Sequence, residues 1–337
     1  MAAPHWLGEP PRDSEELAAW ALSRIAATAA EDARVEATVE LAYAPRDAEP
    51  DLGGRYGPRP VAERPGPRPG EAQTIRLTGV STRMLREEDS DEPWAMLLDP
   101  ARLVRGIGEV LSARRTEDGA VDLTLAPHPL FASPEDPWLP PGARTLTVRV
   151  DPATGFLTAA ELTDAHGTLA TARLTDLHTE AAPSSPEAGR TLARMARTLL
   201  EPARLRAEVR VEAETHEDLM FTPAPSERSW TATCAAGTLT LTGDYEPDRT
   251  SPAAARLAEL LTPARIVSHL AHVTPTSPTS LTATVRPLRT FPFSAWAPDD
   301  GLTCHFTVDP TTGVLLNAEA MTDDRLLFHH TVTALHA

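Results

Sequence analysis

The chain contains no lysine, since all 31 basic residues among its 337 are arginine. Without a lysine amine, a protein can form no Schiff base with a carbonyl substrate or with pyridoxal phosphate. The GxxxxGK[ST] phosphate loop is excluded for the same reason, and GxGxxG, HExxH and GxSxG are also absent. No motif therefore indicates an enzyme, and the sequence predicts no cofactor.

Cysteine and long apolar runs are scarce as well. The two cysteines, Cys234 and Cys304, are too few for a disulfide framework or a thiolate zinc site. No apolar run approaches the roughly 18 residues that would cross a bilayer, so membrane insertion is not expected. The first residues, MAAPHWLGEPPRDSEEL, have neither the basic nor the apolar region of a secretory signal. We therefore expect a cytoplasmic location.

Acidic residues outnumber basic ones, and the formal net charge is −17. The excess is concentrated in residues 1–180, which hold 30 acids and 18 arginines. A field of this sign repels nucleic acids and anionic lipid surfaces and attracts a basic protein partner. Nucleic-acid binding is therefore not expected, whereas a basic partner is one explanation of the charge and solubility is the other.

Internal similarity divides the chain into two copies of one unit. The matched segments keep their order while their offset falls from 170 to 158 residues: 21–41 with 191–211, 97–104 with 260–267, and 148–161 with 306–319. A steadily falling offset indicates two diverged copies, the first of which carries extra loop residues. We predict repeats at 14–178 and 185–337, with a Pro/Gly-rich excursion at Pro45–Gly70 in the first.

Each repeat is predicted to be an α+β unit. A helix opens it, capped by Asp13 in the first repeat and by Ser185 in the second. Two strands and a pair of helices follow, and Asp99 and Thr262 are the expected N-caps of the second helix in each pair. In the first repeat this helix is expected to face the core with Leu103, Val104, Ile107, Val110 and Leu111. About four antiparallel strands end the unit, and in one of them Leu146, Val148 and Val150 alternate with polar residues. The DPATG and DPTTG segments are hairpin turns in which Gly155 and Gly313 take the left-handed position. A sheet with one apolar face must be covered, so we predict a curved antiparallel half-barrel under the helices.

The VDPxTG hairpin and the order of elements resemble two protein families. Val150–Gly155 with Glu161, and Val308–Gly313 with Glu319, are similar to the end of LolA-type lipoprotein carriers and of LprG-type lipid-binding lipoproteins. The similarity covers a small part of the chain and otherwise consists of element order. It implies a half-barrel closed by helices around an acyl-chain cavity, and hence non-enzymatic binding of a lipid or another apolar ligand.

Two tryptophans recur at equivalent positions of the repeats, each in a Pro-rich stretch before the strand that leads into the hairpin. Two interpretations are open: each tryptophan anchors its loop on the sheet, or each lines the mouth of a pocket. Under the second interpretation, apolar residues of the helix pairs form the pocket walls. The predicted ligand-binding residues are Trp138, Trp296, Leu103, Ile107, Ile266 and Leu270.

Histidines are frequent in the second repeat, notably at His305, His329, His330 and His336. Adjacent residues of a strand point to opposite faces, so His329 and His330 cannot bind one ion on a regular strand, and no metal site is expected. The next pair, His269 and His272, lies three residues apart and is expected on one face of the second helix of its pair.

Strand phase also decides how the cysteine and the recurring acids are interpreted. Cys304 alternates in phase with apolar neighbours, which favours a small buried hydrophobe over a nucleophile. Glu161 and Glu319 follow the two hairpins with the opposite phase. They are therefore predicted on a solvated face rather than as an acid/base pair.

These observations lead to three hypotheses. The favoured one is a non-enzymatic binding protein whose half-barrels hold a lipid or another apolar small molecule. The alternative is an interaction or regulatory protein that engages a basic partner through its acidic surface. An enzyme is the third, and the missing motifs make it the least favoured.

Overall fold

The fold is taken from a computed structural model of the chain. It describes residues 4–44, 72–88, 92–128, 138, 140, 142–181, 185–200, 205–214, 228–235, 238–243, 252–286, 296, 301–323 and 325–336. The excursion predicted at Pro45–Gly70 lies outside the described residues. We call residues 4–181 the first half and residues 185–336 the second half.

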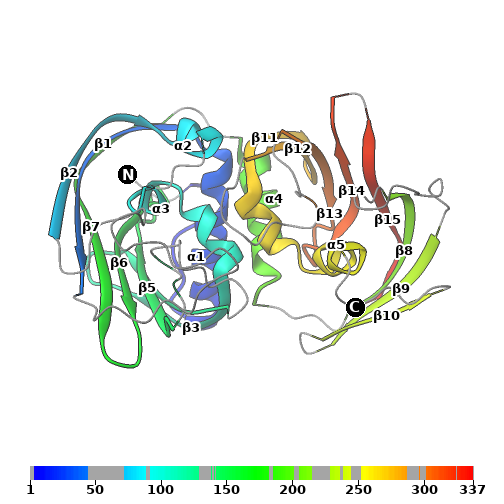
Figure 1. Ribbon diagram of the computed structural model, residues 1–337, viewed down its shortest axis with the longest axis horizontal. Helices are drawn as coiled ribbons and strands as arrows, with labels where there is room; N and C mark the ends of the chain where they lie inside the picture. The colour runs from blue at the N-terminus through cyan, green and yellow to red at the C-terminus, as the bar shows by residue number, and fades with distance from the viewer. Residues whose placement is uncertain are drawn as a thin grey trace, which may run out of the picture.

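The first half is a seven-stranded antiparallel sheet with four short helical segments besides its opening helix (Figure 1). The strand order is β2-β1-β7-β6-β5-β4-β3. Its elements are α1 (Ser14–Ala27), η1 (Thr28–Ala30), β1 (Ala33–Tyr43), β2 (Ala72–Ser81), α2 (Thr82–Glu88), α3 (Ala95–Leu98), η3 (Pro100–Gly106), β3 (Ile107–Arg115), β4 (Val121–Pro127), β5 (Thr145–Val150), β6 (Leu157–Thr163) and β7 (Thr168–Ala181).

The second half is an eight-stranded antiparallel sheet in the order β10-β9-β8-β15-β14-β13-β12-β11. Its elements are α4 (Pro186–Arg197), β8 (Leu205–Glu214), β9 (Arg228–Ala235), β10 (Thr238–Gly243), α5 (Pro252–Leu261), η5 (Pro263–His269), β11 (Leu270–Ser277), β12 (Ser280–Val285), β13 (Thr303–Val308), β14 (Leu315–Met321) and β15 (Leu326–His336).

The two sheets share one pattern of connections. In each half the first strand pairs with the last, as β1 with β7 and β8 with β15, and hairpins then lead across the sheet to β3 or β11. Neither sheet closes on itself, because β3 and β11 each have a single partner strand among the described residues. The protein is therefore α+β, with two open antiparallel sheets. None of the described helices is long and apolar enough to cross a membrane.

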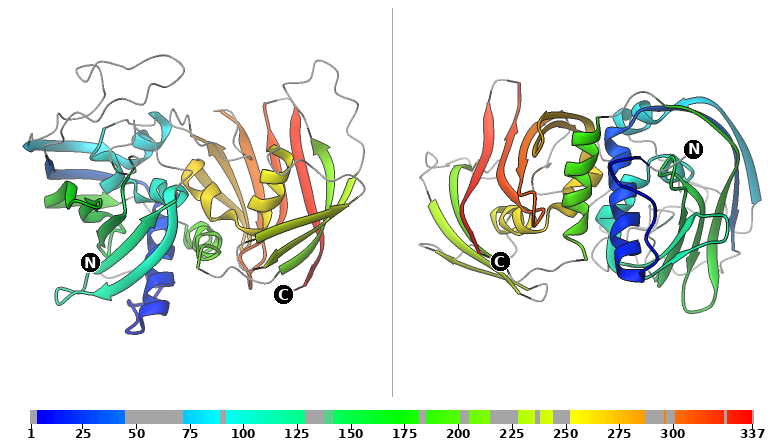
Figure 2. Two further views of the ribbon diagram at one scale, coloured as in Figure 1. Left: turned by 60° about the horizontal axis from the view of Figure 1, so that its bottom comes forward. Right: turned by 180° about the vertical axis from the view of Figure 1, so that it is seen from behind.

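The helices lie between the sheets. Figures 1 and 2 show α1 and α4 side by side at the centre, with a curved sheet on the far side of each. The segments η3 and η5 also pack against one another, so both halves meet through equivalent elements. The caps of α1 and α4 are as predicted: Asp13 accepts from the N–H groups of Glu15 and Glu16, and Ser185 accepts from that of Ala188.

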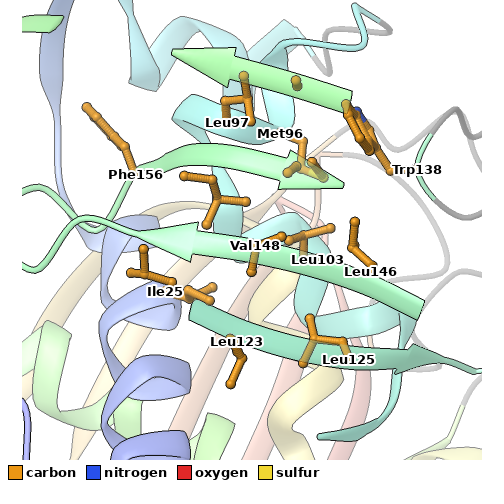
Figure 3. Packing of buried hydrophobic residues seen from close by; sticks show 14 of the residues in the cluster. Ile25, Met96, Leu97, Leu103, Leu123, Leu125, Trp138, Leu146, Val148 and Phe156 are labelled. Atoms are coloured by element: carbon orange, nitrogen blue, oxygen red, sulfur yellow. The ribbon is translucent and has the colours of Figure 1, made fainter. Parts of the chain in front are cut away.

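Alternation along the strands builds the two cores. In β5, Leu146, Val148 and Val150 are buried while the residues between them are half-buried, as the sequence predicts. Figure 3 shows Leu146 and Val148 in one cluster with Ile25 of α1 and with Leu97 and Leu103 of the helical segments. The concave face of each sheet is thus filled by apolar side chains from the strands and from the helices that cover it.

The predicted second helix of the first pair is wrong beyond its first turns. Residues 100–106 form η3, and the chain is then extended in β3, where Val110 is half-buried and Leu111 is 47% exposed rather than facing the core. Gly106 and Gly108 weaken a helix here, and pairing with β4 satisfies the backbone of the extended form. Five strands rather than four therefore follow the helical segments of each half.

Candidate functional site

The six predicted ligand-binding side chains are all part of the packed cores. Their exposed fractions run from 0% to 3%, with Trp138, Leu103 and Ile107 in the first core and Trp296, Ile266 and Leu270 in the second. Trp138 and Leu103 are seen among their packed neighbours in Figure 3. The structure thus brings each set together, but as core residues with little contact with solvent.

Both tryptophans make the same hydrogen bond. Trp138 Nε1 donates to the carbonyl oxygen of Pro93 at 2.6 Å, and Trp296 Nε1 donates to that of Arg256 at 3.2 Å. Pro93 precedes α3, and Arg256 lies in α5, so each indole joins the segment before β5 or β13 to a helical segment. Burial together with this bond fits the anchoring interpretation of the tryptophans.

The DPxTG turns are seated on the ends of the opening helices. Gly155 and Gly313 have φ of +75° and +79°, the left-handed conformation that the sequence predicts. A Cβ atom on Gly155 would lie 2.6 Å from Cγ2 of Thr28, and one on Gly313 would lie 2.4 Å from the carbonyl oxygen of Arg194. The glycines are therefore required by contact with α1 and α4 as well as by turn geometry.

Arg24 fastens the first of these turns to α1. Its guanidinium is 1% exposed, donates to the carbonyl oxygens of Pro152 and Ala153, and pairs with Glu31 at 2.9 Å. The hairpin thus has a structural role, and Asp151, predicted as a turn residue, accepts three hydrogen bonds from Ala153 and Thr154.

An open pocket of about 800 Å³ lies beside this turn. It is formed where β1, β2 and β7 meet the β5–β6 hairpin. The lining residues are Arg34, Glu36, Gly79, Asp151, Ala153, Thr154, Leu177, His178, Thr179 and Glu180. Its size is in the range of small-ligand and peptide side-chain sites.

Irregular backbone borders this pocket. The pairing of β1 shifts register against β2 between Val35 and Ala37 and against β7 between Glu36 and Thr38. Asp176 of β7 has φ of +52°, the single non-glycine residue with positive φ in the described ranges, and Gly79 of β2 has φ of +63°. Bulges of this kind frequently border functional sites because they redirect side chains.

The charge of the pocket is predominantly negative. Three carboxylates, on Glu36, Asp151 and Glu180, accompany one arginine, Arg34. Glu36 and Glu180 have neither an ion pair nor a side-chain hydrogen bond within the described part of the chain. Two exposed carboxylates are therefore available to a ligand. The sequence analysis missed this site because its residues come from distant segments whose association depends on a bulge.

A second group of polar residues lies buried where η3 and η5 meet. Asp99 was expected to cap a helix, but its side chain makes no capping bond. Its Oδ2 instead accepts from Nη1 of Arg286 at 2.6 Å, and the two side chains are 1% and 0% exposed. The prediction was wrong because a buried guanidinium 187 residues away offers a stronger, charge-assisted bond than a backbone N–H.

Neighbouring cations set the ionisation of this group. Burial by itself would raise the pKa of Asp99, but Arg286, Arg86 and Arg102 together hold that pKa below its usual value. The backbone carbonyl oxygen of His269 accepts a hydrogen bond from the backbone N–H of Arg286. Burial first, then Arg105 and Arg286, lower the pKa of the His269 ring well below normal. The His269 ring is therefore neutral inside the folded protein.

The histidines and the cysteine singled out in the sequence lie in different places. His269 ends η5 while His272 lies in β11, where its ring contacts Glu87, so they do not share a helix face as expected. His329 and His330 occupy opposite faces, half-buried and buried. Cys304 is buried, and burial raises the pKa of its thiol to about 12, which agrees with a structural role.

No three His, Cys, Asp or Glu side chains of the described ranges are placed to share one metal ion. Glu161 is exposed and accepts from Thr168, whereas Glu319 is half-buried beside His329 on the outer face of the second sheet.

Comparison of the chain with protein-family models, with curated proteins and with solved structures gave no match.

Proposed function

We propose that the protein is a non-enzymatic interaction protein that binds a basic segment of a partner in the open pocket of its first half. The observation that carries the proposal is the pair of carboxylates, Glu36 and Glu180, exposed in a pocket of about 800 Å³ and engaged by no described side chain. An arginine or lysine side chain entering the pocket would gain charge-assisted hydrogen bonds to them.

The charge of the whole chain supports this choice of partner. The net charge is −17, and residues 1–180 hold 30 acids against 18 arginines. A field of this sign accelerates the approach of a cationic partner and disfavours an anionic one. Recognition would then rest on the pocket, because long-range attraction alone does not select a site.

The proposal is tested with a fluorescent peptide of alternating glycine and arginine, measured by anisotropy over a salt series. Glu36→Gln with Glu180→Gln is expected to weaken binding at least about tenfold, because each lost charged bond costs about 1.5–3 kcal/mol. Glu109→Gln with Glu117→Gln, two exposed positions away from the pocket, gives the same change in net charge. Equal weakening by both double variants would show binding without a site and would contradict the proposal.

A second candidate function is the binding of a lipid or another apolar ligand. The observation that favours it is the apolar concave face of each sheet, covered in the first half by α2, α3 and η3, segments of seven, four and seven residues. Since Leu103, Ile107 and Trp138 are at most 3% exposed, a ligand would enter only when these short segments move away. Native mass spectrometry of protein from its own host tests this, and a mass without ligand would count against it.

We also propose that both halves descend from one duplicated module similar to LolA- and LprG-type proteins. It is supported by the strand order shared from β1 to β3 and from β8 to β11, and by two pairs of equivalent contacts. One pair is the hydrogen bonds of Trp138 and Trp296, and the other is the approach of Gly155 and Gly313 to their helices. Equal topology by itself does not produce matching contacts of this detail.

A further inference from the structure

Polar side chains from three adjacent strands converge on the outer face of the second sheet. His329 of β15 lies between Glu212 of β8 and the residues Asn317 and Glu319 of β14. His329 Nδ1 is 2.6 Å from Oε2 of Glu212. On the other side of the ring, Nε2 is 3.0 Å from Oδ1 of Asn317 and 3.4 Å from Oε1 of Glu319.

Hydrogen bonding fixes the direction of each group. If the single proton of the ring is on Nδ1, where Glu212 can accept it, Nε2 presents an electron pair. The amide of Asn317 donates from Nδ2 to Glu319 at 3.2 Å, and its Oδ1 accepts from Thr331 at 3.1 Å. A nitrogen lone pair therefore faces a carbonyl oxygen and a carboxylate oxygen. A proton on Nε2 or a metal ion would bridge these electron-rich atoms, and the Thr331 hydroxyl, 3.4 Å from Nε2, is the other donor within reach.

The distances suit a metal ion. An ion with bonds of about 2.1 Å holds neighbouring octahedral ligands about 3.0 Å apart, and a tetrahedral ion holds them slightly farther apart. The two distances from Nε2, 3.0 and 3.4 Å, span this range. In many metal sites a carboxylate accepts a hydrogen bond from the second ring nitrogen of a metal-bound histidine and so orients the ring. Glu212 is placed to do this for His329. The side chains of His329 and Glu319 are 19% and 29% exposed, so water can complete the coordination.

The composition of the chain adds an independent observation. Asn317 is the single asparagine among 337 residues, and it stands between the imidazole and the carboxylate. The corresponding places of the first sheet, 158 residues earlier, hold Ala159 and Thr171 beside Glu161. Glu161 there accepts a hydrogen bond from Thr168. The donor set is thus specific to the second half and is no general feature of the fold.

We propose that His329, Glu319 and Asn317 form a binding site for a divalent transition-metal ion, oriented by Glu212. One imidazole, one carboxylate and one amide oxygen favour ions that accept mixed nitrogen and oxygen ligands, such as Zn²⁺, Ni²⁺, Co²⁺ and Mn²⁺. With three protein ligands, the remaining positions are open to water or to a group on a partner.

The test is calorimetric titration of metal-free protein with Ni²⁺ and, separately, with Zn²⁺. The expected result is one tight equivalent in the natural protein, weakened at least about 100-fold by His329→Ala and by Glu319→Gln. Glu212→Gln, which removes only the orienting carboxylate, is expected to weaken binding by about 10–100-fold. His336→Ala, an exposed histidine of the same strand, is the matched control and should change nothing.

A second measurement keeps the proposal testable if a variant is unstable. In the natural protein, Co²⁺ or Mn²⁺ should broaden the NMR signals of the His329 ring before those of the other histidines. Asn317→Asp, which supplies a second carboxylate, should tighten binding of each ion. The proposal is overturned if the natural protein and His329→Ala bind the metal with equal stoichiometry and affinity and no histidine signal is broadened selectively. The group near Nε2 would then be a proton rather than a metal ion.

Discussion

Asp99 and Arg286 face each other across the junction of the two halves, with Oδ2 and Nη1 2.6 Å apart. Neither side chain is more than 1% exposed. Arg286 also donates to the carbonyl oxygen of Leu270, and Arg86 of the first half donates to that of Ala271 in the second. Charged groups in such a setting fix orientation, because any displacement would leave a buried charge without its partner.

Asp99→Asn is expected to lower the free energy of unfolding by about 3–5 kcal/mol, because it leaves the Arg286 charge buried and uncompensated. Replacing both residues by apolar ones, Asp99→Leu with Arg286→Met, should restore most of that loss. Urea unfolding at neutral pH measures both. Asp122→Asn is the control: its partners Arg114 and Arg149 are 76% and 40% exposed, so about 1 kcal/mol or less is expected. A similar loss in both single variants would contradict the prediction.

Stability should fall as the pH drops below about 6.5, the pKa of an unperturbed histidine. In the unfolded chain His269 takes up a proton below that pH, whereas burial and the nearby Arg105 and Arg286 keep its pKa well lower in the folded protein. The unfolded state then binds more protons, so the free energy of unfolding falls by at most about 1.4 kcal/mol per pH unit for this one group. Urea midpoints at pH 7.5 and 5.5 measure the effect, which His269→Gln should reduce.

Three glycines with positive φ should differ in their tolerance of alanine. At Gly301 a Cβ would meet nothing within 4 Å, so Gly301→Ala should cost about 1–2 kcal/mol, the left-handed penalty alone. Gly155→Ala should cost more, because its Cβ would meet the Thr28 and Arg24 side chains. Gly313→Ala should cost most, since a backbone oxygen lies 2.4 Å away and cannot rotate aside. Thermal unfolding ranks the three, and equal losses would show that contact with the helices is unimportant.

Cys304 should resist thiol reagents in the native protein. Its side chain is buried, so a reagent cannot reach the sulfur atom. Burial also raises the thiol pKa to about 12, so the reactive thiolate is scarce at neutral pH. In a Cys234→Ser background, labelling by a maleimide should be negligible in buffer and complete in denaturing urea. Rapid labelling of the native protein would show that this part of the second core opens readily.

Much of the fold could be predicted from the sequence because the relevant forces are local. The caps at Asp13 and Ser185 act over three residues, and the DPxTG turns depend on a proline and a glycine within one segment. Alternation in β5 likewise reports directly which side chains face the core. Leu111 shows the limit of such patterns. The sequence around it is compatible both with an apolar helix face and with a strand, and pairing with β4 stabilises the strand.

The candidate sites could not be predicted in this way. The six apolar residues chosen for a pocket are indeed clustered, but apolar periodicity is the same for a filled core and for a cavity wall. The acidic pocket depends on register shifts in β1, and no local pattern of residues 34–38 reports them. Asp99 preceding a proline has the pattern of a helix cap, and only its distant partner changes that interpretation.

The amino-acid sequence alone determined where helices begin, where hairpins turn and which face of each strand is apolar, since these follow from residues within a few positions of one another. Tertiary structure decided which polar groups lie in contact: Asp99 with Arg286, and Glu212 with His329. Those contacts depend on the order of the strands and on how the two halves pack against each other. The free energy of each contact comes from burial and mutual orientation, which residues far apart in the chain acquire only in the folded state.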